Sequence, residues 1–260
     1  MTTLTPKREI DELLSRLAAI VNSGSVLADD ELTRLQWQAR KLLRSDPADA
    51  HMALGIIASW RRDEATAEQE FLRSLAKGGR RPVWAMNFAT MLRTFNRMEE
   101  ALSQTLAVAQ QGPGPFYVQA LKGAIEWAYA VGRLHLATEL LESLRKHTTE
   151  PLPDKSVNLD RILRPLVEAA GVLGLTDDQM AAMQAPVWAL LREKRIVDTI
   201  VIEDEVYNDG SLFISRTFVL PVPFEEILQL EEALVKTQSE QEETLPIWDF
   251  SVSLREREVA

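Results

Sequence analysis

Imidazole can bind a metal ion or carry a proton near neutral pH, so the three histidines, His51, His135 and His147, are the first candidates for chemistry. None of them has a second histidine or a carboxylate at metal-ligand spacing, and the chain holds no HExxH motif. It also lacks a GxSxG elbow and has no cysteine, which excludes thiol chemistry and cysteine-bound metals. The sequence predicts no catalytic residue, no metal and no cofactor, although a site assembled from distant residues would not be visible in it.

Two groups of like charge are candidate ion sites. Glu203, Asp204 and Glu205 occupy a predicted strand, where they either bind a divalent cation or form an exposed strand edge. We expect the exposed edge. The second group is a candidate anion patch, with a solvated cluster as its alternative, and consists of four arginines: Arg61, Arg62, Arg80 and Arg81.

The formal net charge of −10 is unevenly distributed. Residues 196–260 hold 15 acids and 4 bases, whereas residues 1–195 hold 24 acids and 25 bases. Two modules are therefore expected, and we expect no nucleic-acid partner unless the four arginines form one patch. The N-terminus carries acids where a signal peptide is apolar, and no run of about 18 apolar residues exists, so we expect a cytoplasmic protein without membrane contact.

The stretch from Pro47 to Glu139 repeats a pattern of small and large apolar residues. The other predicted elements are placed relative to these repeats. The pattern occurs as Leu54, Gly55, Ala58 and Ala67, then 34 residues later as Phe88, Ala89, Leu92 and Ala101, then as Ala124, Ile125, Ala128 and Ala137. Pro47, Pro82 and Pro115 recur at nearly the same phase and suit the first helical position. A period of 34 predicts stacked helix–turn–helix repeats.

This pattern resembles the tetratricopeptide repeat over roughly residues 30–146. Leu54 and Gly55 match the Leu-Gly pair of that family's motif, Ala67 matches its alanine and Phe71 its second aromatic residue. The second and third copies keep the small–large pattern but lose the Gly and the Tyr. The resemblance implies an α-solenoid of antiparallel helix pairs, and it places a large packing residue near His51.

In tetratricopeptide domains the first helix of each pair lines a concave groove, and the resemblance assigns ten residues to it. They are Met52, Ile56 and Trp60, then Met86, Asn87, Thr90 and Arg93, then Lys122, Glu126 and Tyr129. Methionine and tryptophan make adaptable contacts of large area, which suits a bound peptide or helix. The alternative, chiefly for Ile56, is packing against an adjacent helix. The Lys/Asn/Arg clamp that holds a C-terminal carboxylate in some family members is absent.

Other helices flank the repeats. The expected segments are a degenerate first pair at 7–21 and about 29–44, repeats at 47–79, 82–112 and 115–146, and closing helices at about 157–171 and 177–194. We expect Trp37 to pack against a neighbouring helix and Pro186 to kink or split the last one.

From Ile196 the apolar period changes from 3.6 to 2. Two strands around Asn208-Asp209-Gly210 predict a hairpin, residues 223–239 predict a helix, and a last strand follows. The inner face of that strand carries Trp248, Phe250, Val252 and Leu254. A right-handed crossover makes it parallel to the second strand, and the simplest order places it beside the first.

The sequence thus predicts a mostly α chain, a tetratricopeptide-like α-solenoid followed by a small C-terminal ββαβ (α+β) module. We expect helical repeats at 1–146, a linker with capping helices at 147–195 and the acidic module at 196–260. The predicted function is a non-enzymatic scaffold that binds a peptide or helical segment of a protein partner in the groove. The C-terminal module would make a second contact or a homo-oligomer through its sheet. The alternative is a small-ligand or catalytic protein with a pocket between the repeats and that module.

Overall fold

The computed structural model describes residues 9–23, 27–79, 81–148, 154–196, 200–208, 211–240, 246 and 249–257. The chain divides into two compact units, Met1–Thr94 (unit 1) and Phe95–Ala260 (unit 2). This division falls inside the third predicted helix pair, and the boundaries predicted at 146 and 195 both lie within unit 2. The three-part organisation stays a prediction. No described helix has the length and apolar character needed to cross a membrane.

Unit 1 is helical throughout its described part. Its elements are α1 (Glu9–Ser23), α2 (Asp29–Lys41), α3 (Pro47–Trp60), α4 (Glu64–Gly78) and α5 (Pro82–Thr94). α3 and α5 begin at the two prolines expected there. An apolar core formed by α1, α2 and α3 includes Ile10, Leu35 and Ile57, so a first helix pair packs on the next one, as predicted.

Trp37 was expected to pack against a neighbouring helix, and this prediction is wrong. Its side chain is 57% exposed, and Nζ of Lys41 lies 3.3 Å from the centre of its ring. The buried residues of α2 are Leu32, Leu35 and Ala39. Trp37 lies outside the buried face that these three residues form, and its side chain faces solvent.

Unit 2 begins with helices that continue the pattern. They are α6 (Met98–Ala109), α7 (Tyr117–Ala130), α8 (Leu134–His147), α9 (Asp154–Leu173) and α10 (Asp177–Glu193). α7 begins two residues after Pro115, because residues 113–116 form bends and a turn. α10 continues through Pro186 without being split, and Thr176 caps it by accepting a hydrogen bond from the Gln179 amide.

Successive helix pairs stack in register, and three contacts between equivalent positions show it. Trp84 Nε1 donates to Asp49 Oδ1 at 2.8 Å, 35 residues apart, near the first turns of α5 and α3. Asn87 Nδ2 lies 3.4 Å from Met52 Sδ, again 35 residues apart. In unit 2, Arg133 just before α8 pairs with Glu99 in α6 at 3.1 Å, 34 residues apart. The helix-pair repeat predicted from the sequence is therefore confirmed.

Small residues permit the close approach within each pair. Ala67, Ala101 and Ala137 are fully buried, as expected for positions where helices touch. Gly55 in α3 faces the ring of Phe71 in α4 so closely that a Cβ would lie 2.7 Å from Cδ2 of that ring. Phe71 in turn packs against Phe88 of α5, with ring centres 5.7 Å apart. One glycine thus sets the α3–α4 distance.

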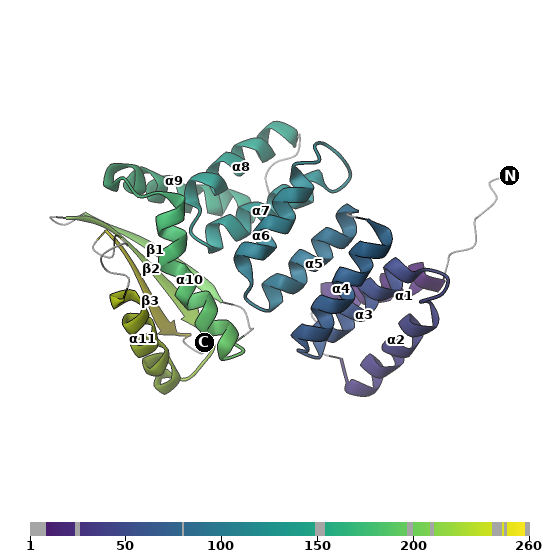
Figure 1. Ribbon diagram of the computed structural model, residues 1–260. Coiled ribbons are helices and arrows are strands. Elements are labelled where there is room, and N and C mark those ends of the chain that lie inside the picture. The colour runs from purple at the N-terminus through teal and green to yellow at the C-terminus, as the bar shows by residue number, and fades with distance from the viewer. Residues whose placement is uncertain are drawn as a thin grey trace. The chain divides into compact units, whose positions relative to one another are not determined.

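The C-terminal part of unit 2 is the predicted ββαβ arrangement (Figure 1). It consists of β1 (Val201–Asn208), β2 (Leu212–Leu220), α11 (Phe224–Ser239) and β3 (Phe250–Glu256). β1 and β2 are antiparallel, and β3 is parallel to β2, as the crossover rule predicts. The strand order is β1-β2-β3, so the expectation that the last strand lies beside the first is wrong. Asp209, Gly210 and Trp248 lie outside the described residues.

Alternate residues of the sheet are buried against helices of unit 2. Ile214, Arg216 and Phe218 are fully buried, and the Phe218 ring meets Trp188 of α10 edge-on at 5.3 Å. Phe250, Val252 and Leu254 are buried on β3, as predicted. α9, α10 and α11 all contact the sheet. At the outer edge of β3, the Leu254 amide donates to Glu231 Oε1 of α11 at 3.0 Å.

The Gly55–Phe71 contact gives a test of the packing. We expect Gly55→Ala to destabilise the protein by about 1–3 kcal/mol, because the added methyl group has no room against a buried ring. Gly171→Ala in α9 is the matched control: a Cβ there meets nothing within 4 Å, so helix propensity should make it neutral or stabilising by up to about 1 kcal/mol. Urea unfolding followed by circular dichroism measures both, and equal effects would contradict this account of the repeat.

Candidate functional site

The residues predicted to line the groove are divided between the two units. Seven belong to α3 and α5 in unit 1, and Lys122, Glu126 and Tyr129 belong to α7 in unit 2. Met52 and Met86 are 3% and 9% exposed, so they form part of the core. Ile56 and Trp60 are partly buried against the core of α1, α2 and α3, which is the alternative considered for Ile56.

The outward face of α5 carries the more accessible part of the predicted set. Thr90 and Arg93 are exposed. Asn87 is half-buried and donates to the Val83 carbonyl at 2.8 Å, and its amide nitrogen also reaches Met52. In unit 2, Glu126 is exposed and Lys122 is half-buried. These side chains are available to a partner, whereas the two methionines contribute mainly to stability.

The structure does not gather the predicted anion patch. Arg61 donates to Gln36 Oε1 at 2.6 Å and to Thr33 Oγ1 at 2.7 Å, so its guanidinium is held against α2. Arg81 lies over the Trp84 ring at 4.9 Å, next to the beginning of α5. The Trp84–Asp49 bond joins the first turns of α3 and α5, so Arg61 at the end of α3 is about 20 Å from Arg81 along the helix axis.

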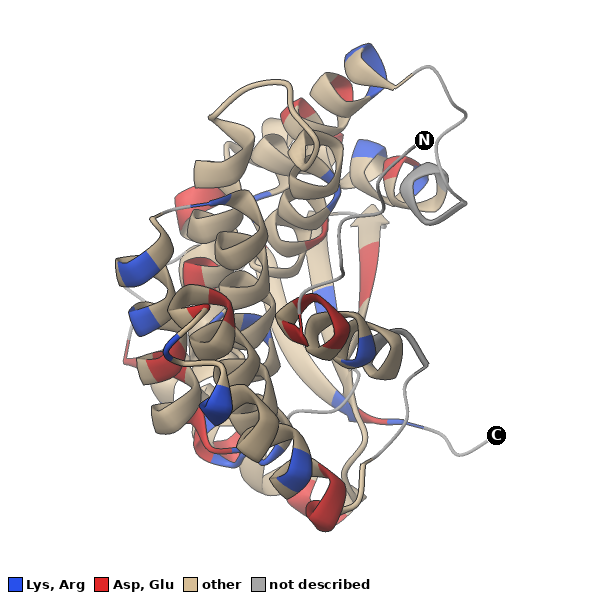
Figure 2. Cartoon of the chain, turned by 90° about the vertical axis from the view of Figure 1, so that its right-hand side faces the viewer, with Lys and Arg blue, Asp and Glu red and all other residues tan. Residues whose placement is uncertain are grey.

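Arg62 is exposed, and Arg80 lies outside the described residues. Figure 2 shows acidic and basic positions interspersed along the helices. Within the described part of unit 1, the solvated-cluster alternative therefore fits the arginines better than an anion site.

The histidines all have structural partners. His51 Nδ1 lies 2.6 Å from Glu70 Oε2, and the Glu70 carboxylate also accepts from Arg73 at 2.8 Å. His147 Nδ1 lies 2.8 Å from the Ser143 carbonyl in the last turn of α8. Within the described ranges, no group of three or more His, Asp or Glu side chains is placed to hold a metal ion.

His135 lies at the beginning of α8, where Asp177 of α10 serves as a cap. The Asp177 carboxylate accepts the backbone amides of His135 and Leu136, each at 3.0 Å, and lies 2.9 Å from His135 Nδ1. A carboxylate at this end of a helix satisfies free amides and complements the helix dipole. The contact docks α10 on α8.

The acidic run in β1 was expected to be an exposed strand edge, and for Asp204 this prediction is wrong. The side chains of Asp204 and Arg216 are both completely buried. Arg216 Nε and Nη2 donate to the two Asp204 oxygens at 2.6 and 2.9 Å, a bidentate ion pair between paired positions of β1 and β2. The inward direction of Asp204 follows from strand alternation, because its partner Arg216 stands between the buried Ile214 and Phe218.

Two helices complete the surroundings of this ion pair. Arg216 Nη1 donates to the Tyr129 carbonyl of α7 and to Gln184 Oε1 of α10, each at 2.8 Å. The Tyr129 hydroxyl donates to Asp204 Oδ2 at 2.6 Å, and its ring lies 4.8 Å from the guanidinium. Gly132 has φ +85 and leaves room for the Gln184 amide, which a Cβ would meet at 1.8 Å. We call Arg216, Asp204, Tyr129 and Gln184 the arginine cluster.

Tyr129 is therefore tied to the sheet and does not stand free on α7. Burial raises its pKa above the ordinary value of 10.0, and the charge of Asp204 raises it further. Burial alone lowers the pKa of Arg216, but the charge of Asp204 and the hydrogen bonds outweigh it, so the pKa of Arg216 is raised. The cluster keeps a charged guanidinium inside the protein.

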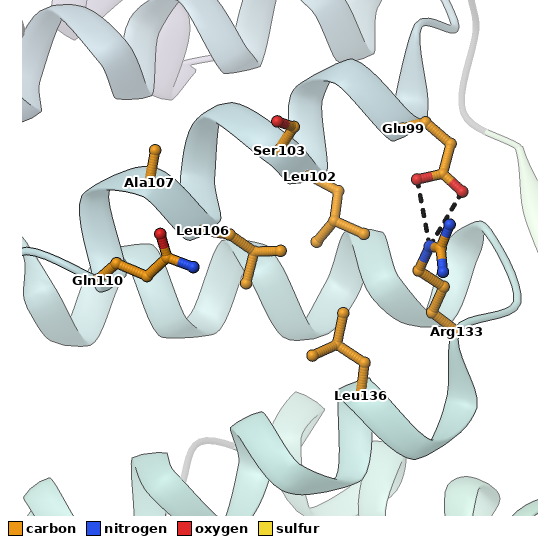
Figure 3. Close-up of a pocket in the computed structure, with 8 residues that line it drawn as sticks. All are labelled: Glu99, Leu102, Ser103, Leu106, Ala107, Gln110, Arg133 and Leu136. Atoms are coloured by element: carbon orange, nitrogen blue, oxygen red, sulfur yellow. Dashed lines mark hydrogen bonds and ion pairs between the residues drawn. The ribbon is translucent and has the colours of Figure 1, made fainter. Parts of the chain in front are cut away.

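An open groove of about 380 Å³ lies on the surface of unit 2 between α6 and α8 (Figure 3). Leu102 and Leu106 of α6 point toward Leu136 of α8, and Gln110 lies at the far end. Arg133 at the near end is shared between Glu99 at 3.1 Å and Asp178 at 2.6 Å. The charges at this end are already paired, so the groove offers an apolar floor and no free ion for selectivity.

No protein-family model matches the chain, and no curated protein does. A solved structure from a study described as the functional characterization of Pseudomonas aeruginosa PilF is similar, with 18% sequence identity and a TM-score of 0.45. The similarity covers 72% of this chain and 84% of that one. A likeness of this size carries no conclusion about what this chain binds.

The arginine cluster predicts a large loss of stability when one charge is removed. Arg216→Met leaves the Asp204 carboxylate buried without its cation, which should cost about 3–5 kcal/mol. The double variant Arg216→Met, Asp204→Leu removes both charges and should be more stable than the single variant. Urea unfolding measures the three proteins, and a double variant that is less stable than Arg216→Met would contradict the description of the pair as buried and mutually compensated.

The raised pKa of Tyr129 predicts a dependence of stability on alkaline pH. The unfolded chain loses the phenolic proton near pH 10, whereas the folded chain keeps it, so this contribution is complete below about pH 10 and is lost as the pH rises above it. Tyr129→Phe should therefore flatten the fall in unfolding free energy above pH 10. Tyr207→Phe, at an exposed position, is the control, and an identical slope in both variants would rule out the effect.

Proposed function

We propose that this chain is a protein-interaction scaffold that binds a peptide or helical segment of a partner along the first helices of its repeats. The proposed binding residues in unit 1 are Trp60, Asn87, Thr90 and Arg93. Lys122 and Glu126 of α7 are the corresponding residues of unit 2. Stacked helix pairs typically present extended surfaces of this kind to proteins.

The observation that supports the proposal most directly is the in-register contact of α3 and α5. Asp49 with Trp84 and Met52 with Asn87 occupy the side where the helices touch. Thr90 and Arg93 lie outside this contact and are exposed, so they are not needed for packing. In a repeat protein the buried residues recur from one repeat to the next, whereas the exposed residues can differ. The exposed residues can therefore determine the partner without a change of fold.

The C-terminal module is proposed to make a second contact, either with another protein or with a second copy through the sheet. β1 and β3 are the edge strands of the described sheet, and an edge strand has unpaired amides and carbonyls. Val201 and Val206 of β1 are 41% and 36% exposed, which suits an added strand. Light scattering on the full chain at increasing concentration tests self-association.

The alternative was a ligand pocket between the repeats and the C-terminal module. In unit 2, the contact between α7, α10 and the sheet contains the arginine cluster, whose guanidinium is fully buried and makes four hydrogen bonds. Because the nitrogen atoms of the Arg216 guanidinium all donate to groups of the protein, none of them points toward a ligand. This observation favours the scaffold.

Substitution of exposed residues on α5 tests the scaffold without disturbing its core. Immobilised wild-type protein is used to capture partners from native lysate, and captured proteins are quantified by mass spectrometry. Thr90→Glu and Arg93→Ala should each reduce capture of the same partner by about tenfold or more, as expected for a contact near the centre of an interface. Leu72→Ser, at a 51% exposed position of α4, is the matched control. Equal capture by all four proteins would reject the proposed surface.

A further inference from the structure

Helix α11 carries two sets of apolar residues, and only one of them is buried among the residues that the structure describes. Ile227, Leu230 and Leu234 are no more than 2% exposed and pack inside unit 2. Phe224, Leu228 and Val235 are 55%, 50% and 63% exposed. At 100° per residue these three lie within about 40° of one another around the helix axis and extend over about 16 Å. They lie in one exposed row along the helix, which we call the α11 strip.

The charges beside the strip are acidic. α11 holds Glu225, Glu226, Glu231 and Glu232 against a single base, Lys236. Around the helix axis Glu231 and Glu232 lie within about 60° of the centre of the strip and Glu225 within about 80°, whereas Glu226 lies on the opposite side. Glu231 accepts the Leu254 amide, and Glu225 and Glu232 make no ion pair with another described residue. Their charge is therefore not neutralised within the described part of the protein. The excess of acids over bases in residues 196–260 gives the same sign to the whole module.

We propose that the α11 strip docks a basic amphipathic helix of another protein. A row of large apolar side chains three turns long matches the apolar face of a partner helix, and flanking Lys or Arg would meet the glutamates. A second copy of the chain is disfavoured, because two α11 helices face to face would place glutamates against glutamates, a juxtaposition that opposes association. Nucleic acid and anionic lipid surfaces are repelled for the same reason.

This surface is separate from the first-helix residues of the proposed function, so either proposal can fail alone. α11 lies in unit 2, beside β3 and α10, whereas Thr90 and Arg93 lie on α5 in unit 1. Variants of the strip therefore leave the α5 surface intact, and variants of α5 leave the strip intact.

The test measures the binding of two labelled peptides to the full chain by fluorescence anisotropy. One is an amphipathic helix of leucine and lysine, and the other has every lysine replaced by glutamate. The lysine peptide should bind at least about tenfold more tightly, and added salt should weaken it. Phe224→Ser with Leu228→Ser should reduce its affinity by at least about tenfold. Circular dichroism checks that the variant is folded.

Two further sets of variants test the site, and light scattering tests whether a second copy of the chain is the partner. Val172→Ser removes an even more exposed apolar side chain, 78% exposed, from α9 and should leave affinity for the lysine peptide unchanged. Glu225→Gln with Glu232→Gln should reduce both the affinity and its salt dependence. Unchanged affinity in the strip variant, or an equal loss in Val172→Ser, overturns the proposal. So does light scattering that finds a wild-type dimer which the strip variant loses, because a second copy would then be the occupant.

Discussion

Removing a guanidinium from water is so unfavourable that everything around Arg216 has to compensate for it. Asp204 supplies the opposite charge from the neighbouring strand, and the remaining donors reach the Tyr129 carbonyl and Gln184. These partners belong to α7, α10 and the sheet. Because each is required to satisfy the same cation, the ββαβ part of unit 2 is held in one orientation relative to α7 and α10. Apolar packing alone, as between Trp188 and Phe218, would fix that orientation less specifically.

The repeat depends on a different constraint, the distance between helices. Gly55 and the buried alanines let each pair close, and the contacts 34 or 35 residues apart align one pair with the next. Residues on the contact side are consequently restricted to shapes that fit, whereas Thr90, Arg93 and Glu126 are not. These exposed residues can therefore be substituted without loss of the contacts that hold the helix pairs together.

The sequence predicted the helix pairs well because their determinants are local and repeated: prolines at the starts of α3 and α5, and alanines at the contacts. It also predicted the strands from their alternation. It failed where a residue's surroundings come from far along the chain. Asp204 was interpreted as part of an exposed acidic run, yet the inward phase of Arg216 within the alternating pattern of β2 was the available signal. Tyr129 was assigned to the groove, because the sequence does not show that its partner Asp204 lies 75 residues away. The place of β3 beside β2 depends on how α11 packs.

The two borders of the sheet are chemically unequal. On β3, the Leu254 amide already donates a hydrogen bond to the Glu231 carboxylate, so this amide is not free to pair with a strand of another molecule. On β1, valines and a tyrosine are open to solvent. A β-sheet can extend through many molecules only if both edge strands of each molecule are free to pair with a neighbour. Because the Leu254 amide is already bonded, pairing of another strand along β3 is disfavoured, and edge-to-edge addition would favour a pair joined through β1 over a fibre.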